Sequence, residues 1–361
     1  MRAINELVQQ HILKLDPYTP GQQPSGEGWI KLNTNEFPYA PPEAVMEAIE
    51  TESTKLARYP NPTSQPLRET VAQFHGVHSD QVIIGNGSDD ILNLLARAFG
   101  GEGRDTFETF PSYSLYPVLT AIAGGSIHSI SFNEDFSLPV EELLDSKADL
   151  LFLTCPNAPT GIRFPMDELR ALARDFDGLL VIDEAYAEFA EASAVPLLGE
   201  FENIVITRTF SKAYGLAGLR VGYGLASAEV IAILDRIRDS YNVNRLSQAG
   251  AMAAIGAQDY YQSAIDKIKS TRESVRATLE GMGWRVYPSE ANFLFAEVLN
   301  GAGEKGPGVA ASLFKHLEER KILVRYFSKH PLTEAFLRIS IGTPSEMERF
   351  IEEVRQWQKS A

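Results

Sequence analysis

The chain has 361 residues, which is long enough for two domains or for one large and one small domain, and 44% of its residues are hydrophobic and 22% charged, as in an ordinary soluble globular protein. Its formal net charge of −15 argues against a nucleic-acid-binding protein, and its single cysteine, Cys155, excludes an intramolecular disulfide bond. No stretch approaches the roughly 20 apolar residues that span a bilayer, and the first residues lack the apolar core of a signal peptide, so we expect a cytoplasmic protein without a membrane partner.

The predicted secondary structure begins with an extended arm and continues into alternating strands and helices. Residues up to about 30 are rich in proline, glycine and glutamine, which favours an extended segment, and helical periodicity follows at 43–49 and 66–74. Short apolar runs then alternate with amphipathic helices, which is the pattern of a mostly parallel sheet covered on both faces. These runs lie at 82–84, 151–153, 179–182 and 204–206.

After about residue 240 the pattern becomes that of a smaller α+β domain. A long helical region reaches residue 282, and strands and helices then alternate to the C-terminus, with strands at 284–287, 293–297, 322–326 and 336–341 and helices at 309–320 and from 345. We therefore predict an α/β fold in three parts. These are an N-terminal arm (residues 1–30), a large domain with a mostly parallel sheet (31–240) and a small C-terminal domain (241–361).

A turn between a predicted strand and a predicted helix, Gly85-Asn86-Gly87-Ser88-Asp89-Asp90, could bind a phosphate. Ser88 can cap the helix, and the glycines let backbone N–H groups approach an anion at the positive end of the helix. An ordinary capped turn is the alternative. Tyr113 follows another strand end, where its ring could either stack on a planar ligand or fill the core.

Two further motifs follow predicted parallel strands, at whose carboxyl ends the ligands of open α/β sheets bind. The turn Asn157-Ala158-Pro159-Thr160-Gly161 follows one strand, and Asp183-Glu184-Ala185-Tyr186 follows the next. An acid such as Asp183 can keep a pyridine nitrogen protonated, and Asn157 and Tyr186 can donate hydrogen bonds to a phenolate oxygen. Taken alone, Asp183 could equally cap a helix or lie at the surface.

The run from Thr209 to Arg220, TFSKAYGLAGLR, places one lysine, Lys212, among two hydroxyl side chains and an arginine. A lysine amine can form a Schiff base with an aldehyde, and hydroxyls and a guanidinium bind a phosphate dianion. Pyridoxal 5′-phosphate is an aldehyde with a phosphate group, so it needs both. Because a lysine is by default a surface residue, the assignment depends on the joint occurrence of all these groups in this order.

Together these motifs resemble the fold-type I pyridoxal-phosphate aminotransferases over nearly the whole chain. By that resemblance Lys212 is the Schiff-base lysine, Asp183 pairs with the pyridine nitrogen, and Tyr186 acts with them, so these three are the expected catalytic residues. The resemblance also implies a set of residues that contact the ring or hold the phosphate, namely Gly87, Ser88, Asp89, Tyr113, Asn157, Thr209, Ser211 and Arg220.

Within this family the chain is most similar to the histidinol-phosphate aminotransferases, in the segments 15–21, 31–39, 58–60 and 322–325. The similarity implies a homodimer in which Tyr59 reaches the cofactor phosphate of the neighbouring subunit. It also implies four substrate-binding residues, which are Tyr18, Asn35, Arg325 and Arg338. The chain departs from the group at Phe37, where the group usually has asparagine.

The resemblance implies transamination of histidinol phosphate and 2-oxoglutarate to imidazole acetol phosphate and glutamate, a reaction of histidine biosynthesis that physiologically runs in reverse. A pair of arginines can bind the anionic groups of either substrate, although Arg325 could instead form a structural ion pair. An aromatic-amino-acid aminotransferase and a phosphothreonine decarboxylase of the same fold are the alternatives, because Phe37 belongs to a segment expected near the substrate pocket.

No metal site is expected, because His75 and His78 have no cysteine or carboxylate at ligand spacing. A non-catalytic ligand sensor is a third hypothesis. The acidic composition and the lack of space for a DNA-binding module before residue 30 argue against it.

Overall fold

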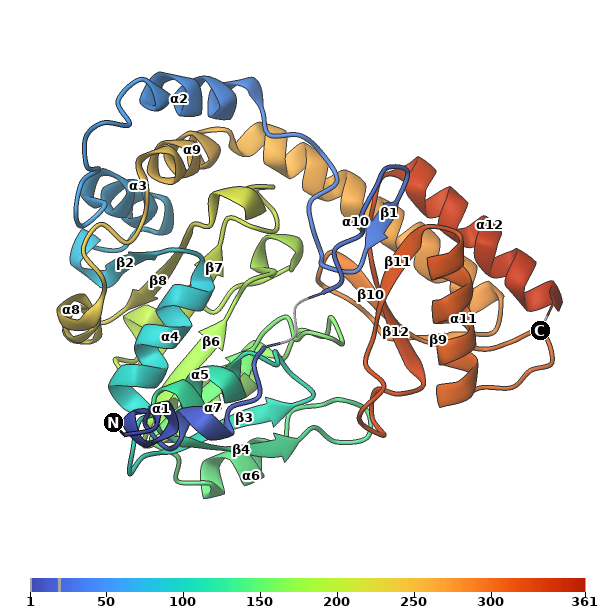
Figure 1. The fold of residues 1–361 in the computed structure, drawn as a ribbon, viewed down its shortest axis with the longest axis horizontal. Helices are drawn as coiled ribbons and strands as arrows, with labels where there is room; N and C mark the ends of the chain where they lie inside the picture. Colours follow the sequence, from blue (N-terminus) through green and yellow to red (C-terminus); the bar gives the residue numbers. More distant parts are fainter. Residues whose placement is uncertain (1, 19–20, 361) are drawn as a thin grey trace.

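The computed structural model describes residues 2–18 and 21–360, so Thr19 and Pro20 of the arm lie outside the described residues. The described chain forms two sheets with helices packed around them (Figure 1). The larger sheet has seven strands in the order β2-β8-β7-β6-β5-β3-β4. Their bounds are β2 (Val82–Gly85), β3 (Asp105–Phe110), β4 (Ser126–Ser131), β5 (Leu150–Thr154), β6 (Leu179–Asp183), β7 (Ile204–Thr209) and β8 (Gly222–Ala226).

The direction of these strands confirms the prediction of a mostly parallel sheet. Strands β7, β6, β5, β3 and β4 are parallel to their neighbours, and only β8 runs antiparallel, between β7 and β2. The parallel register places Thr154, Asp183 and Thr207 opposite one another on β5, β6 and β7. This register brings polar side chains of three distant segments to one level of the sheet.

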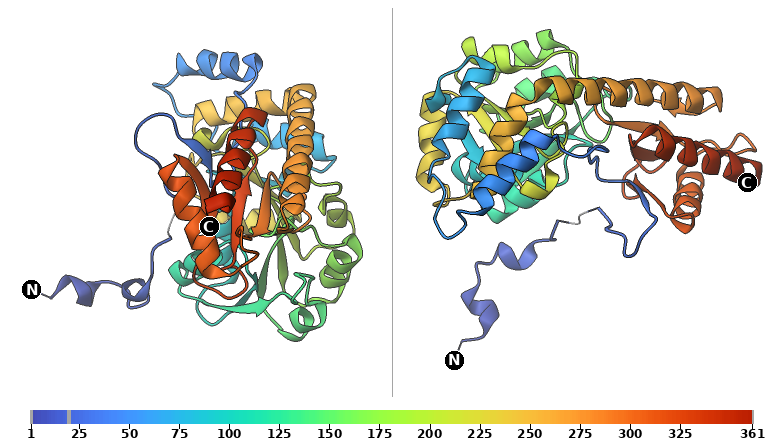
Figure 2. Two further views of the ribbon diagram at one scale, coloured as in Figure 1. Left: turned by 90° about the vertical axis from the view of Figure 1, so that its right-hand side faces the viewer. Right: turned by 90° about the horizontal axis from the view of Figure 1, so that it is seen from above.

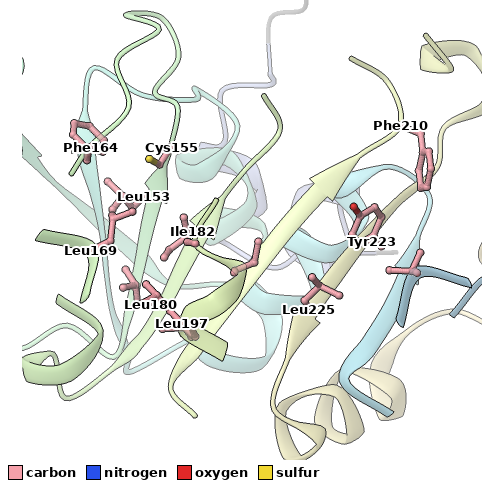
Figure 3. Packing of buried hydrophobic residues seen from close by; sticks show 14 of the residues in the cluster. Leu153, Cys155, Phe164, Leu169, Leu180, Ile182, Leu197, Phe210, Tyr223 and Leu225 are labelled. Carbon is pink, nitrogen blue, oxygen red and sulfur yellow. The ribbon is translucent and has the colours of Figure 1, made fainter. Parts of the chain in front are cut away.

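Both faces of the larger sheet are buried, because successive side chains of a strand point to opposite faces. Val181 packs in a cluster with residues of three helices. Its neighbours Leu180 and Ile182 pack in the cluster on the other face, part of which Figure 3 shows. The first cluster includes α4 (Ser88–Phe99), α5 (Tyr116–Ile122) and α8 (Ala228–Ile237). The second includes α3 (Gln65–His75), α6 (Val140–Asp145), α7 (Met166–Asp175) and α9 (Arg245–Gly256).

The second sheet has five strands in the order β1-β11-β12-β10-β9. Their bounds are β1 (Ile30–Leu32), β9 (Arg285–Val286), β10 (Phe293–Glu297), β11 (Ile322–Tyr326) and β12 (Phe336–Ser340). It packs with α11 (Pro307–Glu319) and α12 (Pro344–Ser360), and α10 (Gln258–Gly281) runs to it from the larger sheet (Figure 2).

Strand β1 differs from the domain boundaries that the sequence predicts. It pairs in parallel with β11, and the Ile30 N–H donates to the Lys321 carbonyl at 2.8 Å. Residues 30–32 therefore belong to the C-terminal sheet, although they were predicted at the junction of the arm and the large domain. Periodicity along the sequence does not reveal a pairing between segments almost 300 residues apart. The predicted arm also contains a short helix, α1 (Ile4–Leu7), and this N-terminal end of the arm projects from the rest of the molecule (Figure 2).

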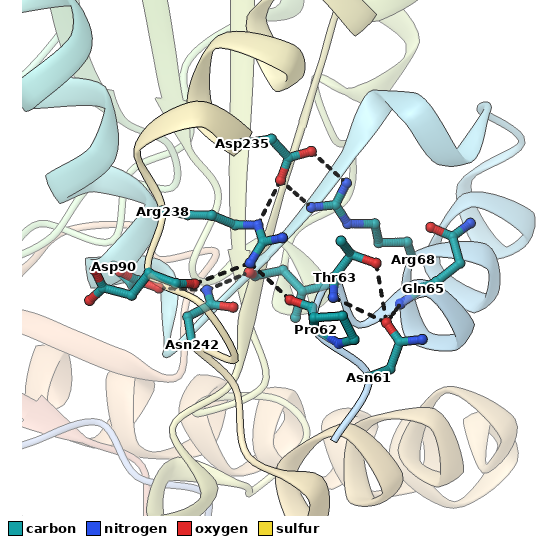
Figure 4. A network of polar contacts seen from close by, with 11 residues as sticks. Asn61, Pro62, Thr63, Gln65, Arg68, Asp90, Asp235, Arg238 and Asn242 are labelled. Atoms are coloured by element: carbon teal, nitrogen blue, oxygen red, sulfur yellow. Dashed lines mark hydrogen bonds and ion pairs between the residues drawn. The ribbon is translucent and has the colours of Figure 1, made fainter. Parts of the chain in front are cut away.

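A polar network fixes the loop before α3 to the chain around α8 (Figure 4). The buried guanidinium of Arg68 donates to both carboxylate oxygens of Asp235, at 2.9 and 2.6 Å. Arg238 donates to Asp235 at 2.8 Å and to the Pro62 carbonyl at 2.8 Å. Although burial acts to raise the pKa of Asp235, the hydrogen bonds from Arg68 and Arg238 lower it overall. The network therefore fixes the loop that follows α2 (Glu43–Ser53).

Gly222 allows β8 to approach the start of α4. A Cβ atom at this position would lie 2.5 Å from the Ser88 nitrogen and 2.8 Å from the Arg208 carbonyl oxygen. Both are backbone atoms that cannot rotate away, so Gly222→Ala should lower the free energy of unfolding by about 1–3 kcal/mol. Chemical denaturation would measure the difference.

Gly218 provides the matched control, because a Cβ atom there would have nothing within 4 Å. Gly218→Ala should change the unfolding free energy by no more than about 0.5 kcal/mol. Equal stability of the two variants would contradict the close approach of β8 to α4.

Candidate active site

The carboxyl ends of β5, β6 and β7 surround a cavity of about 190 Å³. Of the predicted cofactor-binding residues, all but Gly87, Asn157 and Tyr59 line it: Ser88, Asp89, Tyr113, Asp183, Tyr186, Thr209, Ser211, Lys212 and Arg220. A cavity of about 500 Å³ shares Lys212 and Tyr186 with it and is also lined by Tyr18, Asn35, Arg325 and Arg338. The fold thus gathers residues that are scattered over 320 positions of the sequence. We name these spaces the inner and the outer cavity.

One end of the inner cavity is suited to a phosphate. The Arg220 guanidinium lies 3.2 Å from the Ser211 hydroxyl and 3.1 Å from an Asp89 carboxylate oxygen, and the Thr209 hydroxyl accepts from the Ser211 N–H at 3.1 Å. Ser88 opens α4, so the positive end of a 12-residue helix faces the same place. Hydroxyls, a guanidinium and a helix N-terminus therefore converge on one position.

Gly87 leaves space for Arg220 at this end. Its φ of +85° lies in the left-handed region, and an added Cβ would come within 2.6 Å of Arg220 Nη2. Gly87 itself does not line the inner cavity, so its contact with a cofactor phosphate stays a prediction.

Asp183 ends β6 at the floor of the inner cavity and is 2% exposed. Its Oδ2 accepts a hydrogen bond from the Tyr116 hydroxyl at 2.8 Å, and its Oδ1 accepts one from the Thr207 hydroxyl at 3.0 Å. Burial raises the pKa of Asp183 to about 6, although these two hydrogen bonds act in the opposite direction. A buried carboxylate with such a pKa can pair with a protonated ring nitrogen near neutral pH.

Lys212 lies where the two cavities meet. Its Nζ donates to the Thr34 carbonyl at 2.9 Å and lies 5.9 Å from the centre of the Tyr186 ring. Among the described residues Lys212 forms no ion pair with a carboxylate. Tyr186 accepts a hydrogen bond from the Asn35 amide at 2.9 Å, which fixes its hydroxyl beside this amine.

Asn157 and Tyr113 differ in their access to the inner cavity. Asn157 is fully buried and does not line it, since its amide donates to the Pro111 carbonyl at 3.2 Å and accepts from the Thr160 hydroxyl at 2.8 Å. Its contact with a ring hydroxyl therefore stays a prediction. Tyr113 lines both cavities, and its hydroxyl donates to Asp89 at 3.2 Å.

Arg325 and Arg338 face each other across β11 and β12 at the far side of the outer cavity. Arg338 donates to the Asn33 carbonyl at 2.8 Å, and its Nε has no hydrogen-bond partner among the described residues. Its guanidinium lies 5.3 Å from the Phe293 ring centre, and burial lowers its pKa. Like charges directly opposite on adjacent strands repel, so an anion bound between these arginines would stabilise the pair.

Tyr18 reaches the outer cavity from the arm, with its ring edge-on to Tyr113 at 6.2 Å between centres. Tyr59, in contrast, lines neither cavity of its own chain. It is 76% exposed and stacks on Tyr241 with 4.5 Å between ring centres.

Phe37 lies outside both cavities. It packs against the hydrophobic clusters of both sheets, with its ring 6.1 Å from that of Tyr261. This position changes the expectation that Phe37 alters the substrate pocket, because its side chain faces the junction of the two cores.

Three side chains around Asp183 were not singled out from the sequence, namely Tyr116, Thr154 and Thr207. The local sequence does not distinguish Tyr116 from a core aromatic residue, or the two threonines from ordinary strand residues. The strand register is what indicates a role for the two threonines, since Thr154 and Thr207 stand opposite Asp183 on the flanking strands. Aligning the ends of the predicted strands would have revealed these polar side chains at one level.

The donor set fits pyridoxal 5′-phosphate: a phosphate-binding end, an acid for the ring nitrogen and an amine for the aldehyde. No cluster of three or more histidine, cysteine, aspartate or glutamate side chains suited to a metal occurs in the described ranges 2–18 and 21–360. Nor does any helix within those ranges have the length and apolar character needed to cross a membrane.

Comparisons of this chain with known protein families, sequences and structures agree on one family. The aminotransferase class I and II family matches residues 27–354. Histidinol-phosphate aminotransferases from Microcystis aeruginosa and Syntrophotalea carbinolica are 40% and 43% identical to this chain over 94% and 95% of its length, covering 95% and 96% of their own. The crystal structure of histidinol-phosphate aminotransferase from Sinorhizobium meliloti in complex with pyridoxal-5′-phosphate has 28% identity and a TM-score of 0.85, over 92% of this chain and 91% of that one. The chain therefore belongs to the class I and II aminotransferases, among the histidinol-phosphate aminotransferases.

Proposed function

We propose that this protein transfers an amino group between histidinol phosphate and 2-oxoglutarate, forming imidazole acetol phosphate and glutamate, with the reverse direction serving histidine biosynthesis. Its cofactor is pyridoxal 5′-phosphate. The observation that carries the proposal is the pair Arg325 and Arg338 in the cavity that Lys212 shares. Two opposed guanidiniums suit a substrate with a dianionic phosphate, and they also suit the second carboxylate of glutamate.

The residues of the inner cavity would hold the cofactor in a defined orientation. Ser88, Thr209, Ser211 and Arg220 would bind the phosphate, and Asp183 would hold a proton on the ring nitrogen. When bound, pyridoxal 5′-phosphate supplies an aldehyde carbon that takes up the amino group and a ring that withdraws the electron pair left at the substrate Cα.

Lys212 is proposed as the group that moves the proton at the substrate Cα. Its amine lies between the two cavities, beside Tyr186, and makes its hydrogen bond to a carbonyl rather than to a carboxylate. A lysine amine in this position can act as a general base and acid toward the substrate Cα. Tyr186, Asn35 and Tyr18 are proposed to position the substrate against it.

The family relationship favours this reaction over the alternatives. The close relatives are histidinol-phosphate aminotransferases, and Phe37 does not line the cavities, so the reason for suspecting a different substrate is weakened. A purely ligand-sensing role is disfavoured because a lysine, a buried acid and a phosphate-binding end all face one cavity.

The two half-reactions can be followed separately by the visible absorption of the bound cofactor. Glutamate alone should convert that absorption to the aminated form, and imidazole acetol phosphate should restore it, because each substrate completes one half-reaction. Phenylalanine should react with a kcat/KM at least about tenfold lower than histidinol phosphate, since it offers the arginine pair a singly charged carboxylate in place of a dianionic phosphate. An unchanged spectrum with glutamate would refute the transaminase, and release of carbon dioxide would indicate a decarboxylase.

Arg338→Met should reduce kcat/KM for histidinol phosphate by about a hundredfold, because the substrate loses a charge-assisted, partly buried contact. The loss should be smaller for phenylalanine, whose carboxylate carries a single charge, so steady-state kinetics with both substrates tests the role. Arg285→Met is a suitable control, since Arg285 stacks on Tyr287 outside both cavities. Equal losses for the two substrates would contradict a contact of Arg338 with the phosphate that is stronger than its contact with a carboxylate.

We also propose a cytoplasmic homodimer in which Tyr59 completes the site of the neighbouring subunit. An exposed tyrosine that lines no cavity of its own chain supports this arrangement. Light scattering should give the mass of a dimer. Tyr59→Phe and Lys212→Ala should each lose most activity, and refolding the two together should restore part of it, because one site of a mixed dimer is then intact. An active monomer, or no recovery on mixing, would overturn the proposal.

A further inference from the structure

We propose that Tyr116 is a positioning residue that holds Asp183 ionised and aimed at the cofactor ring, at the end of a directional chain of hydroxyls from Ser112 through Thr154. The inference rests on the proposed function only for the identity of the cofactor. Tyr116 itself lines neither cavity, so it acts through Asp183 and touches no ligand.

Tyr116 is fixed by its surroundings. It is fully buried at the first position of α5, and its ring stacks on that of Phe152 with 4.7 Å between centres and 7° between planes. Its hydroxyl oxygen lies 2.8 Å from Asp183 Oδ2 and 2.7 Å from Thr154 Oγ1. Packing thus holds the ring, and the hydroxyl makes two hydrogen bonds.

The direction of these hydrogen bonds follows from the number of protons. An ionised carboxylate can only accept, so Tyr116 must give its single proton to Asp183. The Thr154 hydroxyl must then donate to Tyr116. Thr154 therefore accepts from Ser112, whose hydroxyl lies 3.2 Å away. Every proton in the chain points toward Asp183, and donors arranged in this way strengthen one another.

This chain offsets the cost of burying Asp183. Burial raises the pKa of Asp183, and the negative charge of Asp89 on α4 adds to that effect, whereas the hydrogen bonds from Tyr116 and Thr207 lower it. The other titratable groups that line the same cavity are Tyr113, Tyr186, Lys212 and Arg220. The Tyr116 hydroxyl keeps its proton and can donate it in a hydrogen bond, because burial raises the pKa of Tyr116 well above the usual value.

Ser112 connects the chain to the outer cavity, which it helps to line. Because it donates its proton to Thr154, its oxygen can still accept a hydrogen bond from a ligand. A donor group bound there would polarise the chain further and favour the ionised form of Asp183.

Tyr116→Phe removes the hydroxyl and retains the stacked ring. In the cofactor-free protein, carbon-13 NMR of labelled aspartate, assigned with Asp183→Asn, should show the Asp183 titration displaced upward by about one pH unit, since a hydrogen bond to a charged group contributes about tenfold. The dissociation constant of pyridoxal phosphate, plotted against pH, changes on the acid side of the curve. This acid limb should move to higher pH by the same amount. Thr154→Val, which keeps Tyr116 in place, should also move the Asp183 titration and the acid limb to higher pH, but by a smaller amount.

Tyr223→Phe is the matched control, because Tyr223 is also a buried tyrosine with a hydrogen-bonded hydroxyl, 2.8 Å from His75 Nε2. It should leave the Asp183 titration and the acid limb unchanged. An unmoved titration in Tyr116→Phe, or an equal displacement in Tyr223→Phe, would overturn the role of Tyr116. No displacement in Thr154→Val would overturn the chain.

The two proposals fail in different ways. If the protein does not bind pyridoxal phosphate, the proposed function fails, whereas the NMR titration still tests Tyr116. If Tyr116→Phe does not fold, as judged by circular dichroism, Thr154→Val gives the decisive titration.

Discussion

The parallel register of β5, β6 and β7 is the constraint on which the site depends. It sets Thr154, Asp183 and Thr207 at one level, so that a buried carboxylate lies between hydroxyl-bearing strands. Parallel strands also end at one edge, and the loops that carry Asn157, Tyr186 and Lys212 therefore leave the sheet together. A shift of one residue in any of these strands would turn the corresponding side chain to the opposite face.

Positively charged side chains line the site, although the chain as a whole is negatively charged. The protein carries a net charge of −15, yet Lys212, Arg220, Arg325 and Arg338 all line the outer cavity, where Asp89 is the acid in contact with Arg220. An anionic ligand that enters therefore meets local positive potential on an acidic molecule. The hydroxyls around Asp183 work differently, since they stabilise a charge without adding another.

The fold class could be predicted from sequence because its signal is local. Apolar runs of four or five residues separated by amphipathic helices indicate a covered parallel sheet, and the strand at 322–326 was located to the residue. The motif residues around Lys212 could also be found, since they lie next to one another in the chain. The role of Tyr116 and the strand register that sets Arg325 opposite Arg338 could not, because both depend on which segments become neighbours in the fold.

The pairing of β1 with β11 has a consequence for dividing this protein into parts. Asn33, Thr34 and Asn35 directly follow β1, and they contact Arg338, Lys212 and Tyr186. A fragment beginning at residue 241 would lack both the edge strand and these contacts, and its β11 would present unpaired backbone groups to other chains. The C-terminal sheet is thus completed by the N-terminal segment of the chain. During synthesis this segment must therefore wait for β11 to leave the ribosome before the two strands can pair.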